Sequence, residues 1–384
     1  MRVYVADLGA NTVTLAWGRA DGSSENTIGR GAKSYGEATV HIGNQTIRTK
    51  ASWTQVTNLE PDKKYPYTVE VGGQKIGEGT VRTWQDKSQA FTFFVIGDFG
   101  NASRAQYAIA RRMEEEYKKL ESSGEPVRFV LSMGDNIYGK ISSGGARDRD
   151  WEAKFFLPYE YILKSVPFKA VLGNHDGNES ESRADLAVCL DNLFMPDRWY
   201  RFTYANFAEF IALDSTTNTE SGPTSPAYTD GGKQSTWLKA ALAAPPLPWR
   251  LAVLHHPMFS AGPGHSNALE KLRHWFDLFK NTHVQAVFSG HEHNLQFSER
   301  NANTGNMQFI LSGSGGELRS GSVRKRMKAA SIRSWANQNQ FLIVRIREGE
   351  MTIQPVGTTT QSVLLRDENS RAVEQPVRVK NLQH

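Results

Sequence analysis

The stretch Ala90-Phe91-Thr92-Phe93-Phe94-Val95-Ile96-Gly97-Asp98-Phe99-Gly100 joins an apolar run to a glycine and an aspartate. The apolar run is rich in β-branched and aromatic residues, so it predicts a buried strand. Gly97 allows the backbone to turn sharply, which brings Asp98 to the carboxyl end of that strand. Open α/β sheets bind their ligands beyond the carboxyl ends of the strands. The stretch therefore predicts an α/β domain with a site after this strand.

The same order, a predicted strand followed by polar side chains, recurs four times further along the chain. The stretches are Gly134-Asp135-Asn136-Ile137-Tyr138, Gly173-Asn174-His175-Asp176, Leu254-His255-His256-Pro257 and Gly290-His291-Glu292-His293-Asn294. They offer carboxylate, amide, phenol and imidazole groups, which are oxygen and nitrogen ligands for metals. One metal takes about four to six ligands, so the set is enough for two ions that share a bridging group. Two metals about 4 Å apart promote in-line displacement at phosphorus.

Each of these residues has a simpler interpretation when it is taken alone. An aspartate at the end of a strand usually caps a helix or forms a turn. A pair such as His291 and His293 often belongs to the surface or the core. Taken together, ligand types at the ends of five predicted strands, four of them beside a glycine, favour a metal site.

In these stretches the chain resembles the calcineurin-like metallophosphoesterases. Tyr138, three residues after Asp135, narrows the resemblance to the purple acid phosphatases. The resemblance is strong over residues 90–320, moderate over residues 1–84 and weak beyond. It implies a four-layer α/β/β/α metallophosphoesterase domain that hydrolyses phosphate monoesters by attack of a metal-bound hydroxide.

Two other functions remain open at this stage. A phosphodiesterase or nucleotide hydrolase could use the same site, because the surrounding loops decide between monoesters and diesters. A catalytically dead scaffold that binds a partner is less favoured. Such relatives usually lose metal ligands, whereas this chain has a suitable residue at each of the family's seven ligand positions.

The resemblance also implies a ligand set for each metal. The first metal takes Asp98, Tyr138 and His293, with Asp135 as the bridge. The second metal takes the bridge together with Asn174, His255 and His291. His255 is preferred to His256 because Pro257 follows it by two residues, as in the family. A tyrosine phenolate suits Fe(III) at the first position, and Fe, Zn or Mn fits the second.

Two further histidines are predicted to act on the substrate. His175 adjoins a ligand, and Asp176 is expected to orient its ring. His265 lies ten residues after His255, which is the offset of an outer histidine in the plant-type enzymes. Either ring could bind a phosphate oxygen or protonate the leaving alkoxide. A histidine on a surface loop is the equally favoured alternative for His265.

The first part of the chain, residues 1–86, reads as an all-β sandwich. Short alternating runs are separated by turn signals such as Asp21-Gly22 and Gly72-Gly73, which is typical of small sandwiches. Trp17 and the segment 59–67 resemble fibronectin type III domains. The metallophosphoesterase domain is expected over residues 90–360, followed by a β tail over residues 361–384. The sandwich is expected to be structural.

The composition is that of an ordinary globular protein of 384 residues with a net charge of +5. This charge is spread over the chain, so it is weak evidence for a nucleic-acid partner, and we expect none. The resemblance implies a small phosphate ester as the substrate. No segment reaches the ~20 apolar residues of a membrane span, and no signal peptide is visible. Cys189 is the single cysteine and cannot form an intrachain disulfide. The resemblance favours a secreted or periplasmic protein, and the oligomeric state stays open.

A basic run, from Arg319 to Arg333, follows a glycine-rich segment. Such a run could guide anionic substrates to the site or bind a polyanion. We interpret it as a solvated loop, which is the more common role of such runs.

Overall fold

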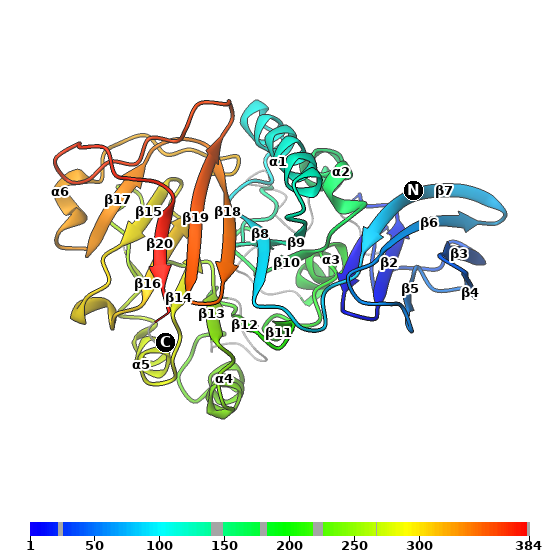
Figure 1. The fold of residues 1–384 in the computed structure, drawn as a ribbon, viewed down its shortest axis with the longest axis horizontal. Coiled ribbons are helices and arrows are strands. Elements are labelled where there is room, and N and C mark those ends of the chain that lie inside the picture. The colour runs from blue at the N-terminus through cyan, green and yellow to red at the C-terminus, as the bar shows by residue number, and fades with distance from the viewer. Residues whose placement is uncertain (22–25, 140–148, 177–182, 218–225, 266, 382–384) are drawn as a thin grey trace.

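The computed structural model describes residues 1–21, 26–139, 149–176, 183–217, 226–265 and 267–381. Two sheets of the N-terminal part lie at one end of the molecule, and a larger part with two sheets and most of the helices forms the rest (Figure 1). None of the helices that these residues form is long and apolar enough to span a membrane.

The N-terminal part is all-β, as predicted. One sheet has the order β1 (Arg2–Leu8), β2 (Val13–Gly18) and β5 (Trp53–Val56). The other has the order β4 (Gln45–Thr49), β3 (Ala38–Ile42), β6 (Lys64–Val71) and β7 (Gln74–Arg82). All neighbouring strands are antiparallel. Along β6 every second side chain is buried, which is the alternation expected of a sheet with one face towards a core.

The larger part contains a six-stranded and a seven-stranded sheet. The first has the order β10 (Phe168–Ala170), β9 (Val127–Ser132), β8 (Ala90–Ile96), β18 (Gln340–Arg347), β19 (Glu350–Gly357) and β20 (Val377–Lys380). The second has the order β11 (Tyr200–Tyr204), β12 (Ala208–Ala212), β13 (Trp249–Val253), β14 (Ala286–Ser289), β16 (Gln308–Ser312), β15 (Leu295–Ser298) and β17 (Ile332–Ala336). The strands that lead to the predicted ligands run parallel to one another within each sheet: β8, β9 and β10 in the first, and β13 and β14 in the second.

Helices cover the outer faces of these two sheets. Helix α1 (Arg104–Ser122) contacts β9, β18 and β19, and α4 (Lys233–Ala243) packs beside α5 (Arg273–Asn281). Apolar side chains of α4 and α5 share a core with the seven-stranded sheet. Between the sheets, the ring of Phe93 contacts Phe210 and Phe288. The order helix, sheet, sheet, helix confirms the predicted four-layer fold.

The remaining helices are short or lie at the edges of the layers. They are a π-helix over Glu152–Phe156, α2 (Glu160–Leu163), α3 (Arg183–Asn192), a 3-10 helix over Ala302–Thr304 and α6 (Arg324–Met327).

The starts of α1 and α5 differ, because only α1 has a side-chain cap. Ser103 caps α1, because its hydroxyl accepts the backbone N–H of Gln106 at 3.1 Å. Helix α5 begins at Arg273, after turns over residues 269–272. Just before these turns, the backbone N–H of Ala268 donates to the carbonyl of Pro257.

Polar contacts join the N-terminal sheets to the larger part. The indole N–H of Trp84 donates to the carbonyl of Arg128 at 3.0 Å, and the Arg128 side chain pairs with Asp62 at 2.9 Å. Lys169, on β10, forms an ion pair with Asp7. We retain the division into residues 1–86, 90–360 and 361–384 as a proposal, noting that β20 pairs with β19 in the six-stranded sheet.

Candidate metal centre

The five predicted ligand segments follow parallel strands of the two packed sheets. Asp98, Asp135 and Asn174 follow β8, β9 and β10 of the six-stranded sheet, while His255 and His291 follow β13 and β14 of the seven-stranded sheet. The carboxyl ends of both sheets therefore meet at one place, which is where open α/β sheets bind ligands.

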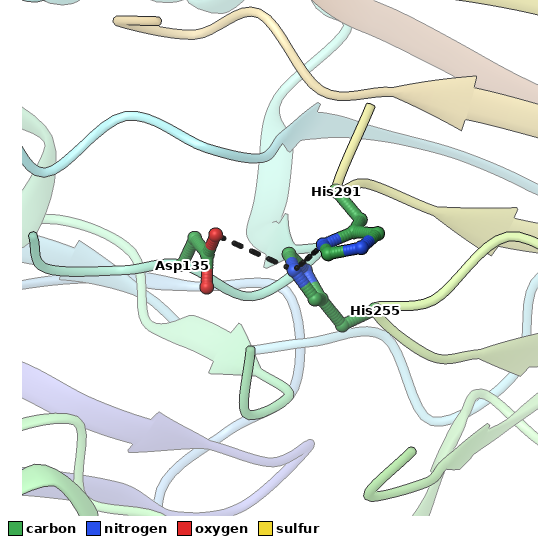
Figure 2. A group of neighbouring side chains, drawn as sticks. All are labelled: Asp135, His255 and His291. Carbon is green, nitrogen blue, oxygen red and sulfur yellow. Dashed lines mark hydrogen bonds and ion pairs between the residues drawn. The ribbon is translucent and has the colours of Figure 1, made fainter. Parts of the chain in front are cut away.

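A first group of donor atoms surrounds Nε2 of His255. This nitrogen lies 3.0 Å from Asn174 Oδ1, 3.2 Å from His291 Nδ1 and 3.4 Å from Asp135 Oδ2. Figure 2 shows the two rings and the carboxylate directed towards one another. The other ring nitrogen, Nδ1, lies 2.8 Å from the carbonyl of Met133. Since a carbonyl only accepts, Nδ1 donates to it, and Nε2 is the nitrogen left to bind a metal once it is deprotonated.

A second group lies around the hydroxyl of Tyr138. The Tyr138 oxygen is 3.3 Å from both Asp98 Oδ1 and His293 Nε2, and these two atoms are 3.5 Å apart. Ligand atoms of Asp98, Asp135 and His293 lie within 4.8 Å of one another, as do those of Asp135, His255 and His291. Asp135 therefore belongs to both groups.

The spacing and charge of these donors fit two metal ions. Ligands bound at about 2.1 Å lie about 3.0–3.4 Å apart in octahedral or tetrahedral coordination, close to the separations found here. Asp98 and Asp135 are 0% and 1% exposed. Burial raises the pKa of Asp98, and the charge of Asp135 raises it further despite the opposing effect of His255. Two adjacent buried carboxylates require a cation, which metals would supply.

Backbone strain is concentrated at the same residues. Asp98, Asp135 and His291 have φ values of 56°, 49° and 74°, in the left-handed region. This conformation costs about 1–3 kcal/mol for a residue other than glycine and is typical of functional sites. Glycine allows the close approach: a Cβ on Gly290 would lie 2.4 Å from Asp98 Oδ2, and one on Gly173 would lie 2.2 Å from Asp135 Oδ1.

Asp176 connects two of the ligand loops. Its carboxylate accepts the backbone N–H groups of Gly173, Asn136 and Ile137 at 2.7, 2.8 and 3.1 Å, and the side-chain amide of Asn136 at 2.8 Å. Burial and the charge of Asp135 raise its pKa to about 7. The prediction that Asp176 orients the ring of His175 therefore needs correction, because its oxygens bind the loops after β9 and β10.

The two predicted substrate histidines have different neighbours in the two donor groups. His175 is exposed, and the centre of its ring lies 4.6 Å from that of Tyr138. Its backbone N–H donates to Asp135 Oδ1 at 2.9 Å. The ring of His265 stacks on His291 with 3.9 Å between the ring centres. His265 thus borders the donor groups instead of lying on a distant surface loop.

Sequence reasoning missed two residues that hold His265. Arg319 Nη2 donates to His265 Nε2 at 3.0 Å. The buried carboxylate of Glu292 accepts the backbone N–H of His265 at 2.6 Å. Arg319 Nε lies 3.6 Å from Glu292 Oε2, and the Arg319 N–H donates to the carbonyl of His293 at 3.0 Å. The position of Glu292 between two predicted ligands was a usable signal, whereas Arg319 was assigned to a solvated basic run.

His256 lies beside the centre and binds a different partner. Its Nδ1 is 3.0 Å from the hydroxyl of Ser215, and its ring centre is 4.4 Å from that of His291. Burial and the charge of His255 lower the pKa of His256 to about 3. The ring is therefore neutral at ordinary pH.

Comparison with known proteins gives a family consistent with this geometry. The model of the calcineurin-like phosphoesterase family matches residues 91–295. Tartrate-resistant acid phosphatase type 5 of Homo sapiens is 30% identical over 253 residues, which cover 59% of this chain and 73% of that protein.

Two solved structures share the fold over nearly the whole chain. PhoD has a TM-score of 0.70 at 14% identity, covering 98% of this chain and 92% of its own. Purple acid phosphatase PPD1 from yellow lupin (Lupinus luteus) has a TM-score of 0.69 at 14% identity, covering 99% of this chain and 73% of its own. Because the family model spans more than half of the chain, this protein belongs to the calcineurin-like phosphoesterases and is a phosphoester hydrolase of the two-metal type.

Proposed function

We propose that this protein hydrolyses phosphate monoesters at the centre formed by the two donor groups. The observation that supports the proposal most strongly is that Asp135 belongs to both groups, as a bridging ligand must. One ion would be held by Asp98, Tyr138 and His293 and the other by Asn174, His255 and His291, with Asp135 between them. When bound, the two ions would lower the pKa of a water molecule, hold the ester oxygens and neutralise the charge that develops at phosphorus.

We also propose which metals the two groups hold. The phenol oxygen of Tyr138 joins a carboxylate at the first group, and such hard oxygen donors favour Fe(III). The second group combines imidazole and amide donors, which suit Fe, Zn or Mn.

The remaining polar residues would act on the substrate. Arg319 donates to His265 Nε2, so this imidazole is neutral and carries its proton on Nδ1. His265 can therefore donate a hydrogen bond to a phosphate oxygen or to the leaving oxygen. The expected proton transfer to the alkoxide would need the imidazolium form, which burial and the charge of Arg319 disfavour by lowering the pKa of His265. His175, beside Tyr138, would bind a phosphate oxygen, and Arg319 adds a fixed positive charge near both groups.

A metal analysis combined with a visible absorption spectrum tests this proposal. We expect two ions per chain and a broad absorption band that Tyr138→Phe removes, because the band arises from charge transfer between phenolate and Fe(III). Tyr161→Phe is the matched control, since Tyr161 is 40% exposed on α2. Fewer than two ions at full loading, with no turnover of p-nitrophenyl phosphate, would overturn the two-metal phosphatase.

The ester preference needs its own measurement. Monoesters carry one more negative charge than diesters, and Arg319 supplies a nearby cation. We expect p-nitrophenyl phosphate to be hydrolysed with a higher kcat/KM than bis-p-nitrophenyl phosphate. A strong preference for the diester would replace the monoesterase by a phosphodiesterase on the same site.

From the resemblance to purple acid phosphatases we propose two further properties, a location and a domain type. The protein would act outside the cytoplasm, secreted or in the periplasm, and its N-terminal part would be a fibronectin type III-like domain. Fractionation of the native cells tests the first point, and recovery of activity in the cytoplasmic fraction would refute it.

A further inference from the structure

A cavity of about 240 Å³ opens beside the second donor group. The rings of His256, His265 and His291 form part of its lining. The rest comes from segments before α4 and α5 and after β12, and includes Thr217, Tyr228, Asn267 and Lys271. The cavity therefore adjoins the proposed reaction centre and is built largely from residues that hold no metal in our proposal.

Lys271 gives this cavity its charge. No carboxylate is among the described residues that line it. Lys271 is exposed and forms no ion pair with any described residue, whereas Lys239 on the neighbouring helix pairs with Asp230 at 3.2 Å.

The size and lining of the cavity suit an organic group of moderate size. A dry cavity of ~150 Å³ holds a benzene molecule, so about 240 Å³ leaves room for a ring with a substituent. Tyr228, Pro257 and Leu272 offer apolar surface, and Asn267 and Thr217 offer hydrogen-bonding groups.

A carboxylate matches the cation better than a second phosphate. Recognition of a phosphate usually uses the forked guanidinium of arginine or several cations. Lys271 is a single point charge and the one charged side chain among the described residues of the lining. One ammonium balances one carboxylate.

We propose that this cavity receives the leaving group of the ester and that Lys271 selects leaving groups that carry a carboxylate. The inference rests on the proposed phosphatase function and adds the substrate class: phosphate monoesters of small, ring-sized organic acids. The carboxylate binds Lys271 with help from Asn267, while the phosphate group lies at the metals.

Two esters that differ only in this charge test the proposal. Wild-type, metal-loaded, full-length protein is assayed with 4-carboxyphenyl phosphate and 4-carbamoylphenyl phosphate, which match in size and have similar leaving groups. We expect kcat/KM to favour the carboxylate about tenfold, the worth of one charge-assisted hydrogen bond. The two esters should differ in KM and not in kcat, because Lys271 touches the same group in the ground state and in the transition state.

Variants assign the preference to one side chain. Lys271→Gln should bring the ratio of the two kcat/KM values to about one, Lys271→Glu should invert it, and Lys271→Arg should retain it. Lys280→Gln, at an exposed position in the last turn of α5, is the matched control and should leave the ratio at its wild-type value.

The outcomes distinguish failure of the leaving-group assignment from failure of the phosphatase function. If wild type hydrolyses both esters alike, or if Lys271→Gln keeps the preference, the leaving-group assignment is wrong while the phosphatase function stands. If wild type with its metals hydrolyses neither ester nor p-nitrophenyl phosphate, both the leaving-group assignment and the phosphatase function are wrong.

Discussion

Arg319 connects the basic segment to the metal centre through four contacts. Its guanidinium donates to His265, lies near Glu292 and occupies the space that a Cβ on Gly264 would need. Its backbone N–H donates to the carbonyl of His293. The side chain is 32% exposed, so part of its charge is shielded from solvent and reaches the substrate site. Arg319 thus positions His265 and contributes charge.

Replacement of Arg319 by Gln should lower kcat/KM for p-nitrophenyl phosphate by 10- to 100-fold, the usual cost of losing a residue that supports a site. Metal content should stay at the wild-type value, because Arg319 is no ligand. Steady-state kinetics with metal analysis measures both. Arg326→Gln, an exposed residue of the same basic run, should leave kcat/KM unchanged; equal losses in the two variants would mean that only net charge matters.

Single residues differ in how well the sequence predicts them. Asp98, Asp135 and His291 could be found because each follows a glycine at the end of a strand pattern. The place of Arg319 could not, because it depends on a loop that returns to the site from a distant part of the chain. The bonds of Asp176 were also out of reach, since they require the spacing between two loops.

At the level of elements, the loops after β9 and β10 are held together by a single carboxylate. Asp176 accepts four hydrogen bonds from Gly173, Asn136 and Ile137. These loops carry Asp135 and Asn174, so their alignment sets the distance between ligands of the two donor groups.

Asp176→Asn should destabilise the fold by about 1–3 kcal/mol, because its amide nitrogen cannot accept and leaves buried N–H groups unpaired. Denaturant unfolding of wild type and variant, both without metals, measures this free energy. Asp277→Asn, at an exposed position on α5, is the control. A change below about 0.5 kcal/mol would show that the loops hold their places without this carboxylate.

Helix α1 is tied to β18 by an ion-pair network. Glu125, just after the helix, binds Arg345 at 3.0 Å and Arg347 at 2.8 Å. Burial alone would raise the pKa of Glu125, but hydrogen bonds and charge from the two arginines outweigh it and lower the pKa below the ordinary 4.5. A carboxylate with a lowered folded-state pKa stabilises the fold above its unfolded-state pKa, and this contribution disappears as the pH falls through the folded-state value.

The stability difference between wild type and Glu125→Gln should therefore be full at pH 7 and shrink as the pH falls below about 4.5. Its size should stay within about 1 kcal/mol, since the groups are partly exposed. Urea unfolding of both proteins between pH 7 and pH 3 measures the difference. A difference that is constant with pH, or that grows in acid, would contradict this account.

At the level of the whole molecule, the N-terminal sheets and the larger part share one hydrophobic core. A continuous cluster of buried side chains runs from Val3 to Val379. Trp84 lies at the junction, where its ring contacts Phe129 and Tyr204 at 5.8 and 5.3 Å between ring centres. A continuous core predicts that the two parts unfold together.

Calorimetry of the metal-free protein should therefore show one transition rather than two. Trp84→Ala should destabilise the fold by about 3–5 kcal/mol, as large-to-small changes of buried aromatic residues do, and lower the temperature of that transition. Trp53→Ala, a partly buried position on β5, should cost less. Two resolved transitions in wild type would show that the parts unfold independently.

The layers of the whole molecule could be predicted more fully than their internal order. Alternation of strand and helix patterns after Phe91 and the family resemblance gave the four layers. The pairing of β15 between β16 and β17, and of β20 with β19, depends on backbone hydrogen bonds between distant segments, which hydrophobic periodicity does not encode.

The candidate centre takes Asp98, Asp135 and Asn174 from one sheet and His255 and His291 from the other. An ion that binds donors of both sheets favours the arrangement in which the sheets are in contact, so the free energy of binding is added to the free energy of unfolding. Loss of cofactor and separation of the layers are then two sides of one equilibrium. Scarcity of transition metals would shorten the life of the protein as well as silence it.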